Sequence, residues 1–171
     1  DALGGTTSFF TVVGTISNVD TTPPVLRTLD LSTTSVDLGG GPVTITATIR
    51  LTDDLSGVGD DLTLNAEVRW RSPSGNQFID ASFFAYKSGN DKDAVFDNTF
   101  PITFNANSET GTWSIEYFRV EDVAGNQKTY SLGELEALGI NRSIEVSGAF
   151  GGSDTTPPVL RTLDLSTTSV D

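Results

Sequence analysis

Cysteine, histidine and methionine are absent from this sequence of 171 residues. Without cysteine the chain forms no disulfide and no thiolate metal site. Without histidine or cysteine, the usual nucleophile–base pairs of covalent catalysis cannot be assembled. No apolar run approaches the length of a membrane helix. We therefore expect no enzyme and no membrane insertion in this stretch. The missing oxidisable residues favour an extracellular or cell-surface location.

Basic residues are also scarce. The chain carries 10 Lys and Arg against 23 Asp and Glu, which gives a net charge of −13. Binding to a phosphate backbone needs clustered basic side chains, so we expect no nucleic acid partner. Acidity of this kind serves solubility. It also serves divalent cation binding, but only where the carboxylates cluster in space.

A long exact repeat is the most informative feature that is present. Residues 20–37 and 154–171 both read DTTPPVLRTLDLSTTSVD. The copies begin at Asp20 and Asp154, so one period is 134 residues, which is enough for a self-sufficient domain. Such a repeat is typical of a tandem array, whose expected partners are neighbouring identical repeats of the same chain. It divides the chain into the C-terminal strand of a preceding repeat (1–19), a complete repeat (20–153) and the N-terminal strand of the following repeat (154–171).

Apolar and polar residues alternate with period two through most of the complete repeat, as in half-buried strands. The apolar phase slips at Phe118, which indicates a bulge or a strand that is covered on both faces. Residues 132–139 suit one or two helical turns that end at glycine. The expected strands are 25–31, 43–51, 62–70, 77–86, 100–104, 113–120 and 143–148.

This pattern predicts an all-β fold. About seven short strands in a domain of this size indicate an antiparallel immunoglobulin-like β-sandwich, with one short helical turn before the last strand. Because the chain has no cysteine, Trp70 or Trp113 is expected to fill the core where antibody domains carry a disulfide.

Three motifs carry a family resemblance. The opening DTTPP, the stretch TDDLSGV at 52–58 and the stretch VEDVAGN at 120–126 resemble bacterial immunoglobulin-like repeats of very long surface proteins and adhesins. The resemblance covers the whole repeat. It implies a stacked, structural spacer that often binds calcium and holds a binding module away from the cell.

The acidic residues of these motifs are candidate metal ligands. In an antiparallel sandwich, the start of the first strand and the ends of the second and sixth strands meet at one pole. Calcium takes six to eight oxygen ligands, commonly carboxylates and backbone carbonyls. The acidic residues expected at this pole would supply several such ligands. A Gly-Gly-Ser joint precedes Asp154, and a bound cation at the pole would stiffen it. The candidate calcium ligands are Asp20, Asp53, Asp54, Glu121, Asp122 and Asp60, which Asp61 could join.

The same acids have a simpler interpretation as turn formers, because Asp and Asn side chains hydrogen-bond nearby backbone groups. A second acidic stretch, 90–93 with Asp97, lacks the glycine and the distal glutamate of a helix-loop-helix calcium motif. We expect that stretch to be a solvated hairpin tip.

Aromatic residues offer an alternative function. Phe83, Phe84 and Tyr86 lie close in sequence, so at least one of the two phenylalanines should face outward and could bind a surface polysaccharide or protein. A further alternative is a subunit of a surface filament that exchanges strands, since both chain ends duplicate elements of the complete repeat.

Overall fold

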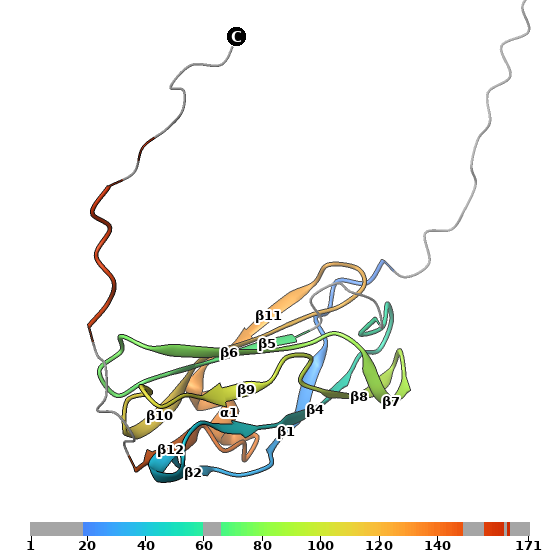
Figure 1. The fold of residues 1–171 in the computed structure, drawn as a ribbon. Helices are drawn as coiled ribbons and strands as arrows, with labels where there is room; N and C mark the ends of the chain where they lie inside the picture. The colour runs from blue at the N-terminus through green and yellow to red at the C-terminus, as the bar shows by residue number, and fades with distance from the viewer. Residues whose placement is uncertain (1–18, 60–65, 149–155, 163, 165–171) are drawn as a thin grey trace, which may run out of the picture.

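The computed structural model describes residues 19–59, 66–148, 156–162 and 164. This part of the chain is mostly β, with one short α-helix and one 3-10 helix (Figure 1). The strands are β1 Val25–Leu31, β2 Ser35–Asp37, β3 Val43–Ile45, β4 Ala47–Thr52, β5 Ala66–Arg71, β6 Phe78–Phe83, β7 Tyr86–Asn90, β8 Asp93–Asp97, β9 Ile102–Phe104, β10 Gly111–Glu121, β11 Gln127–Tyr130 and β12 Ser143–Ser147. The helices are η1 Leu38–Gly40 and α1 Leu132–Ala137.

The strands form two large sheets and one small one. The first sheet has the order β1-β4-β8-β7, and the second has the order β2-β12-β10-β5-β6 with β11 also paired to β10. β3 and β9 form a separate pair. All pairs are antiparallel except β12 with β2. The all-β, antiparallel prediction is therefore confirmed.

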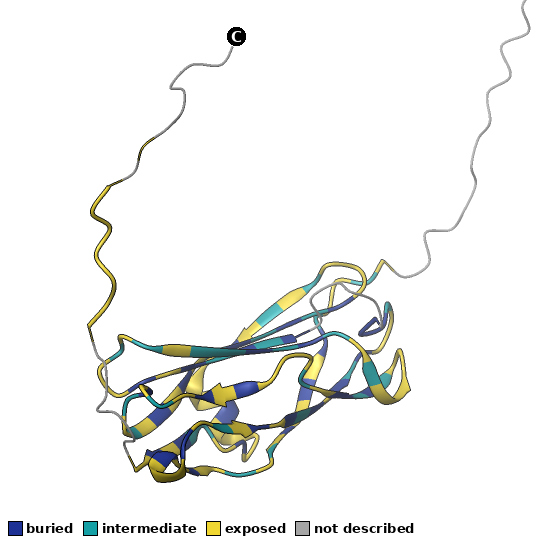
Figure 2. Ribbon diagram, in the orientation of Figure 1, coloured by how far each residue is buried: buried dark blue, intermediate teal, exposed yellow. Residues whose placement is uncertain are grey.

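One hydrophobic core joins the two large sheets (Figure 2). Trp70 and Trp113 are both fully buried in it, and the Trp113 ring packs edge-on against Phe104 at a centroid distance of 5.3 Å. The hydroxyl of Tyr130 accepts a hydrogen bond of 2.7 Å from the Leu26 amide, which ties β11 to β1. Burying aromatic rings of this size contributes a large share of the hydrophobic stabilisation.

Several predicted strands are shorter or more divided than the alternation suggests. The segment 43–51 is split into β3 and β4 because the backbone of Thr46 bonds Ser32 instead of a ladder partner. The segment 77–86 is likewise split into β6 and the start of β7. The bulge is confirmed as a register shift between Ile115 and Tyr117 in the pairing of β10 with β5. Of the predicted strand 62–70, only the part from Ala66 onward lies within the described residues.

The predicted helical turn is confirmed as α1. Its first turn has a complete capping box, in which the Ser131 hydroxyl accepts from the Glu134 amide and the Glu134 carboxylate accepts from the Ser131 amide. The pKa of Glu134 is lowered to about 2, mainly by the hydrogen bond from the Ser131 amide and next by the one from the Lys128 ammonium. No helix among the described residues is long and apolar enough to cross a membrane.

The first and last described segments of the complete repeat lie at opposite poles. Asn126, which follows β10, donates to the carbonyl of Asp20, whereas Val146 in β12 pairs with Gly111 at the start of β10. β10 runs the length of the molecule between these points (Figure 1). We call the end near Asp20 the entry pole and the end near Gly111 the exit pole. The described residues of the second copy, 156–162 and 164, are exposed and form no strand, and the predicted strand at 1–19 lies outside the described residues except for Val19.

Candidate metal centre

Three segments that are far apart in sequence meet at the entry pole, as the strand pattern predicts. The Ser56 amide donates to Asp20 Oδ2 at 2.6 Å, and Asn126 Nδ2 donates to the Asp20 carbonyl at 3.2 Å. The Val123 amide donates to the Gly57 carbonyl at 3.0 Å. The pole therefore consists of the segment after Val19, the loop after β4 and the turn after β10.

The loop after β4 is shaped by its own first residue. Asp53 Oδ1 accepts hydrogen bonds from the amides of Leu55 at 3.0 Å and Gly57 at 2.5 Å. This closure requires Gly57 to adopt a φ of +96°, which favours glycine because other residues are strained there. The loop also hydrogen-bonds the hairpin tip between β7 and β8, where the Asp53 amide donates to the Lys92 carbonyl.

Three carboxylates come together in front of this loop. One carboxylate oxygen from each of Asp20, Asp53 and Asp54 lies within 4.8 Å of the others. Thr22 Oγ1 links two of them, since it lies 3.0 Å from Asp20 Oδ1 and 2.9 Å from Asp54 Oδ1. We call these three acids the acidic cluster. Its members range from buried Asp53 through half-buried Asp20 to exposed Asp54.

Asp53 contributes the most informative atom of the cluster. Its side chain is only 1 % exposed, and Oδ2 is buried with no hydrogen-bond partner among the described residues. The nearest ammonium is that of Lys92, 4.0 Å from Oδ1, and this group donates to the Leu55 carbonyl. A buried carboxylate oxygen without a partner is costly, and a bound cation would satisfy it.

The electrostatics of the cluster favour a cation. Hydrogen bonds from Ser56 and Thr22 hold the pKa of Asp20 well below its ordinary value of 3.8, so this carboxyl is ionised at neutral pH. Lys92 supplies one positive charge beside three carboxylates. Ionised carboxylates at this separation repel one another unless a cation lies between them.

The structure does not bring every predicted ligand into the cluster. Asp122 lies at the same pole, but its two carboxylate oxygens accept from the amide and the side-chain Nδ2 of Asn126, at 2.8 Å and 2.7 Å. Glu121 Oε2 accepts from Gln127 Nε2 at 2.9 Å. These two acids serve the turn after β10, as the alternative interpretation states. Asp60 and Asp61 lie outside the described residues.

The second acidic stretch is a hairpin tip, as expected, and its acids have partners of their own. Asp93 accepts two hydrogen bonds from Arg50, and Asp97 pairs with Lys87 at 3.1 Å. The prediction of a merely solvated tip is incomplete, because its backbone supports the loop after β4 through the carbonyls of Asp91 and Lys92.

The three candidate aromatic residues do not form an exposed platform. Phe83 is fully buried, since β6 turns it into the core, and this excludes it as a contact residue. Phe84 is half-buried against the edge of Phe100, at a centroid distance of 6.2 Å. Tyr86 packs against Phe96 at 5.2 Å, and its hydroxyl donates to Asp91 Oδ1 at 2.9 Å.

Two participants at the entry pole were not predicted from the sequence. Thr22 and Ser56 contact the carboxylates, yet both are common loop residues. The signal that was available is their position, because each lies two or three residues after an acid of the motifs DTTPP and TDDLSGV. Searches of protein-family models, curated proteins and solved structures found no match to this chain.

Proposed function

We propose that this chain is a structural, non-enzymatic spacer repeat of a long extracellular surface protein, stiffened by calcium at the entry pole. The observation that carries the proposal is the buried, unpartnered Oδ2 of Asp53 within a cluster of three carboxylates. The cluster lies where the repeat begins, which is the place where a cation affects the junction with the preceding repeat.

An immunoglobulin-like sandwich is part of this proposal, and the strand order supports it. In such domains one sheet has the order A-B-E-D and the other contains G-F-C. The order β1-β4-β8-β7 corresponds to the first when strands are lettered along the chain, and β12-β10-β5 corresponds to the second. The helix α1 lies between β11 and β12, which together take the place of the last strand.

The placement of the two poles supports the spacer role. Because the repeat starts at one pole and β12 ends at the other, successive repeats would follow one another in line (Figure 1). Asp154 opens the second copy as Asp20 opens the first, so each junction would carry the same carboxylate. An array of this kind spans distance with little mass.

The chemistry of the cluster fits calcium. Calcium prefers oxygen ligands, tolerates irregular geometry and accepts carboxylates together with carbonyls and water. Asp20, Asp53 and Asp54 would hold the ion, and the ion would neutralise their mutual repulsion. The sequence supplies no histidine or cysteine that would favour a softer metal.

Thermal unfolding with and without calcium tests the proposal. An ion that binds only the folded state stabilises it by mass action, by about 2.7 kcal/mol at a hundredfold excess over the dissociation constant. For a domain of this size, that gain corresponds to a rise of several degrees in Tm. Magnesium should give a smaller shift, because it requires near-ideal octahedral geometry. A Tm that is indifferent to both calcium and chelator would contradict calcium binding and leave the three acids as turn formers.

A further inference from the structure

A groove on the side of the molecule is lined by uncharged polar and apolar side chains, whereas the entry pole carries three carboxylates. The groove has a volume of about 330 Å³, within the range of ligand pockets, and lies between the start of β6 and the segment around β9. It is lined by Asn76, Gln77, Phe78, Ile79, Thr103, Asn105, Asn107, Ser108 and Trp113. We call it the amide groove, because four of these side chains are carboxamides.

Among the described residues, no ionisable side chain lines the amide groove, although the chain has a net charge of −13. Four other grooves on the described surface each include charged residues. The polar groups of the amide groove are carboxamides and hydroxyls, which both donate and accept hydrogen bonds. A lining of this kind matches a neutral ligand that is rich in hydroxyl groups.

The walls of the groove are held in place by hydrogen bonds. Gln77 Nε2 donates to the Asn107 carbonyl at 3.0 Å, and Gln77 Oε1 accepts from the Glu109 amide at 2.8 Å. Asn105 Oδ1 accepts from the Asn107 amide at 2.9 Å, and the buried Ser108 hydroxyl accepts from the Asn105 amide at 3.0 Å. A wall that is already ordered loses little conformational entropy when a ligand binds.

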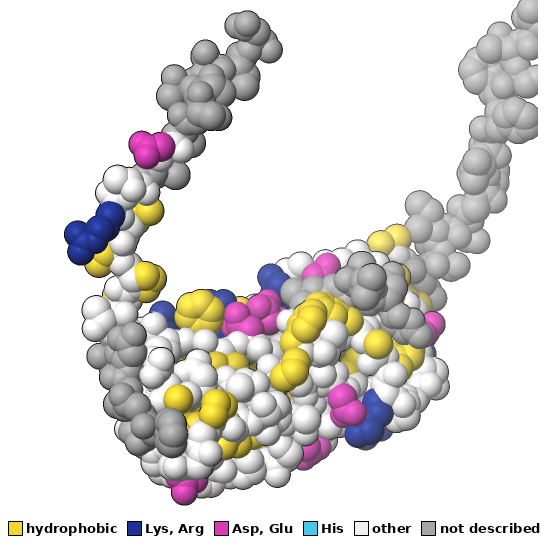
Figure 3. All heavy atoms as spheres, in the orientation of Figure 1, with side chains coloured by type: hydrophobic (Ala, Val, Ile, Leu, Met, Phe, Trp, Pro, Cys, Tyr) yellow, Lys and Arg dark blue, Asp and Glu magenta, His cyan; other side chains and the backbone are white. Residues whose placement is uncertain are grey.

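An aromatic ring borders the groove. Phe78 is 58 % exposed, and Figure 3 shows other apolar side chains scattered over the surface in view. The guanidinium of Arg69 lies 4.2 Å from the centre of its ring, and the charge of Arg69 is paired with Asp80 through two hydrogen bonds of 2.7 and 2.9 Å. The ring is therefore fixed in orientation and still accessible to the apolar face of a sugar.

We infer that the amide groove binds a neutral saccharide. The Phe78 ring would pack against one face of a pyranose, and the carboxamides of Asn105 and Asn107 would hydrogen-bond its hydroxyls. This goes beyond the spacer role, which needs no ligand. The groove borders the loops next to Gly111 at the exit pole, so its function is separable from that of the acidic cluster at the entry pole.

An array of neutral and charged oligosaccharides, probed with the whole 171-residue chain, tests the inference, because multivalent display detects weak single-site binding. Titration of the chain with the best soluble tetrasaccharide from the array then gives the affinity. We expect at least one neutral glycan to bind, and Phe78→Ala and Asn107→Ala each to weaken that binding about tenfold or more. Within the described part of the chain, Asn107 makes its hydrogen bonds through its backbone and none through its side chain, so Asn107→Ala should fold normally.

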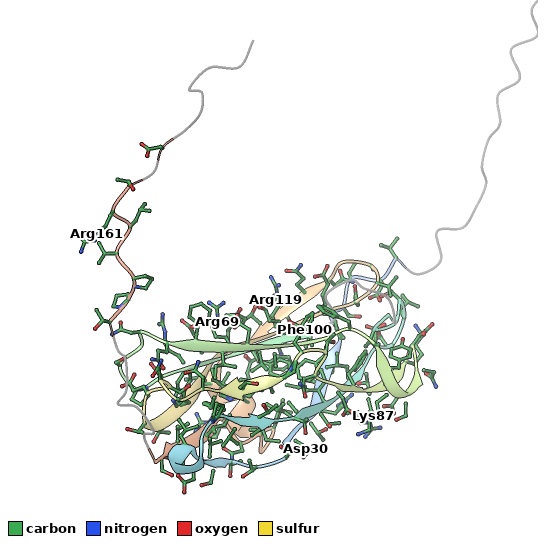
Figure 4. All side chains as sticks on the ribbon, viewed as in Figure 1. Asp30, Arg69, Lys87, Phe100, Arg119 and Arg161 are labelled. Atoms are coloured by element: carbon green, nitrogen blue, oxygen red, sulfur yellow. The ribbon has the colours of Figure 1, made fainter. Side chains whose placement is uncertain are left out.

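The matched control is Phe100→Ala. Phe100 is 60 % exposed, about as much as Phe78, and it precedes β9. Figure 4 shows it apart from Arg69, the residue of β5 whose guanidinium contacts the Phe78 ring. Its removal should leave the affinity unchanged, and all three variants should keep the calcium dependence of Tm. The inference is overturned if no neutral glycan binds, if only charged glycans bind, or if Phe100→Ala weakens binding as much as Phe78→Ala does.

Discussion

Two loops at the entry pole each begin with an aspartate. They differ in whether the loop donates hydrogen bonds to both oxygens of that carboxylate. Asp53 follows β4 and Asp122 follows β10, and they are 7 % and 5 % exposed. Four residues after Asp122 stands Asn126, whose amide and side chain satisfy both carboxylate oxygens. Four residues after Asp53 stands Gly57, which has only an amide to donate, so Oδ2 is left without a partner. The Asp122 carboxylate is thus a turn former, and the Asp53 carboxylate remains available to a cation.

The largest expected difference between the two loops is the loss of stability when the glycine of each loop is replaced by alanine. Gly57 and Gly125 have φ values of +96° and +85°, so alanine is strained at both. A Cβ on Gly57 would also come within 2.8 Å of Asp91 Cβ, whereas one on Gly125 meets nothing within 4 Å. We expect Gly57→Ala to cost about 3 kcal/mol or more and Gly125→Ala about 1 kcal/mol, measured by urea unfolding of metal-free protein. Equal costs would show that the loop after β4 is no more tightly held than the other turn.

The next largest expected difference is in how Asp53→Asn and Asp122→Asn change the stabilisation by calcium. Asp53→Asn should remove the calcium-dependent gain, which is about 2.7 kcal/mol at a hundredfold excess, because the isosteric amide brings no charge. Asp122→Asn should keep that gain but lower the stability of the metal-free protein by about 1–3 kcal/mol, since it places an amide group against the Asn126 side chain. Metal-free Asp53→Asn should not be destabilised, because it loses a buried charge.

Calcium titrations of the Tm in both variants provide the measurement. If Asp122→Asn also lost the calcium response, Asp122 would be a ligand despite its two hydrogen bonds to Asn126, and the ligand set expected from the sequence alone would be restored. Asp30→Asn is a suitable control, because Asp30 is exposed on β1 and does not belong to the acidic cluster.

The sequence predicted the meeting of three loops at one pole because strand alternation and strand order are sufficient for that inference. It did not separate Asp53 from Asp122, because the choice of hydrogen-bond partners depends on how each turn closes. The difference between Gly57 and Asn126 was visible in the sequence, but its meaning required the turn geometry. The prediction of Phe83 as a ligand-binding residue was wrong for a related reason. Only the register of β6 determines which of Phe83 and Phe84 faces the core, and the structure buries Phe83.

The strand count was underestimated for a physical reason as well. β8 contains Ala94 and Phe96 on its buried side, but its other positions are acidic or half-exposed, so the sequence pattern there indicates a solvated hairpin tip and not a strand. β2 has only three residues, and its pairing with β12 is parallel, which local alternation cannot reveal.

A smaller effect concerns the lysine beside Asp53. Lys92 lies 4.0 Å from Asp53 Oδ1, and its side chain is 47 % exposed, so it competes only weakly with a bound cation. Lys92→Gln should therefore raise the calcium affinity about threefold, as measured by calorimetric titration. Lys87→Gln on the same hairpin is the matched control, because Lys87 pairs with Asp97, outside the acidic cluster. An affinity that falls in Lys92→Gln would mean that the ammonium orders the loop and does not oppose the ion.

The smallest effect is a pH dependence that belongs to the loop after β4 and its partner Asp20. Hydrogen bonds from Ser56 and Thr22 stabilise ionised Asp20, so its pKa in the folded state lies below the ordinary value of 3.8. A carboxyl with a depressed folded pKa adds stability above the pKa of the unfolded state, and this stability is lost as the pH falls through 3.8 and below. In metal-free protein, the wild type should therefore be more stable than Asp20→Asn at pH 6, and the difference should shrink below pH 3.8. Urea unfolding midpoints of the two proteins measure this difference between pH 6 and pH 2.5. A difference that stays constant over this range would mean that Asp20 contributes hydrogen-bond geometry alone, and that repulsion from the other two acids cancels the benefit of its charge.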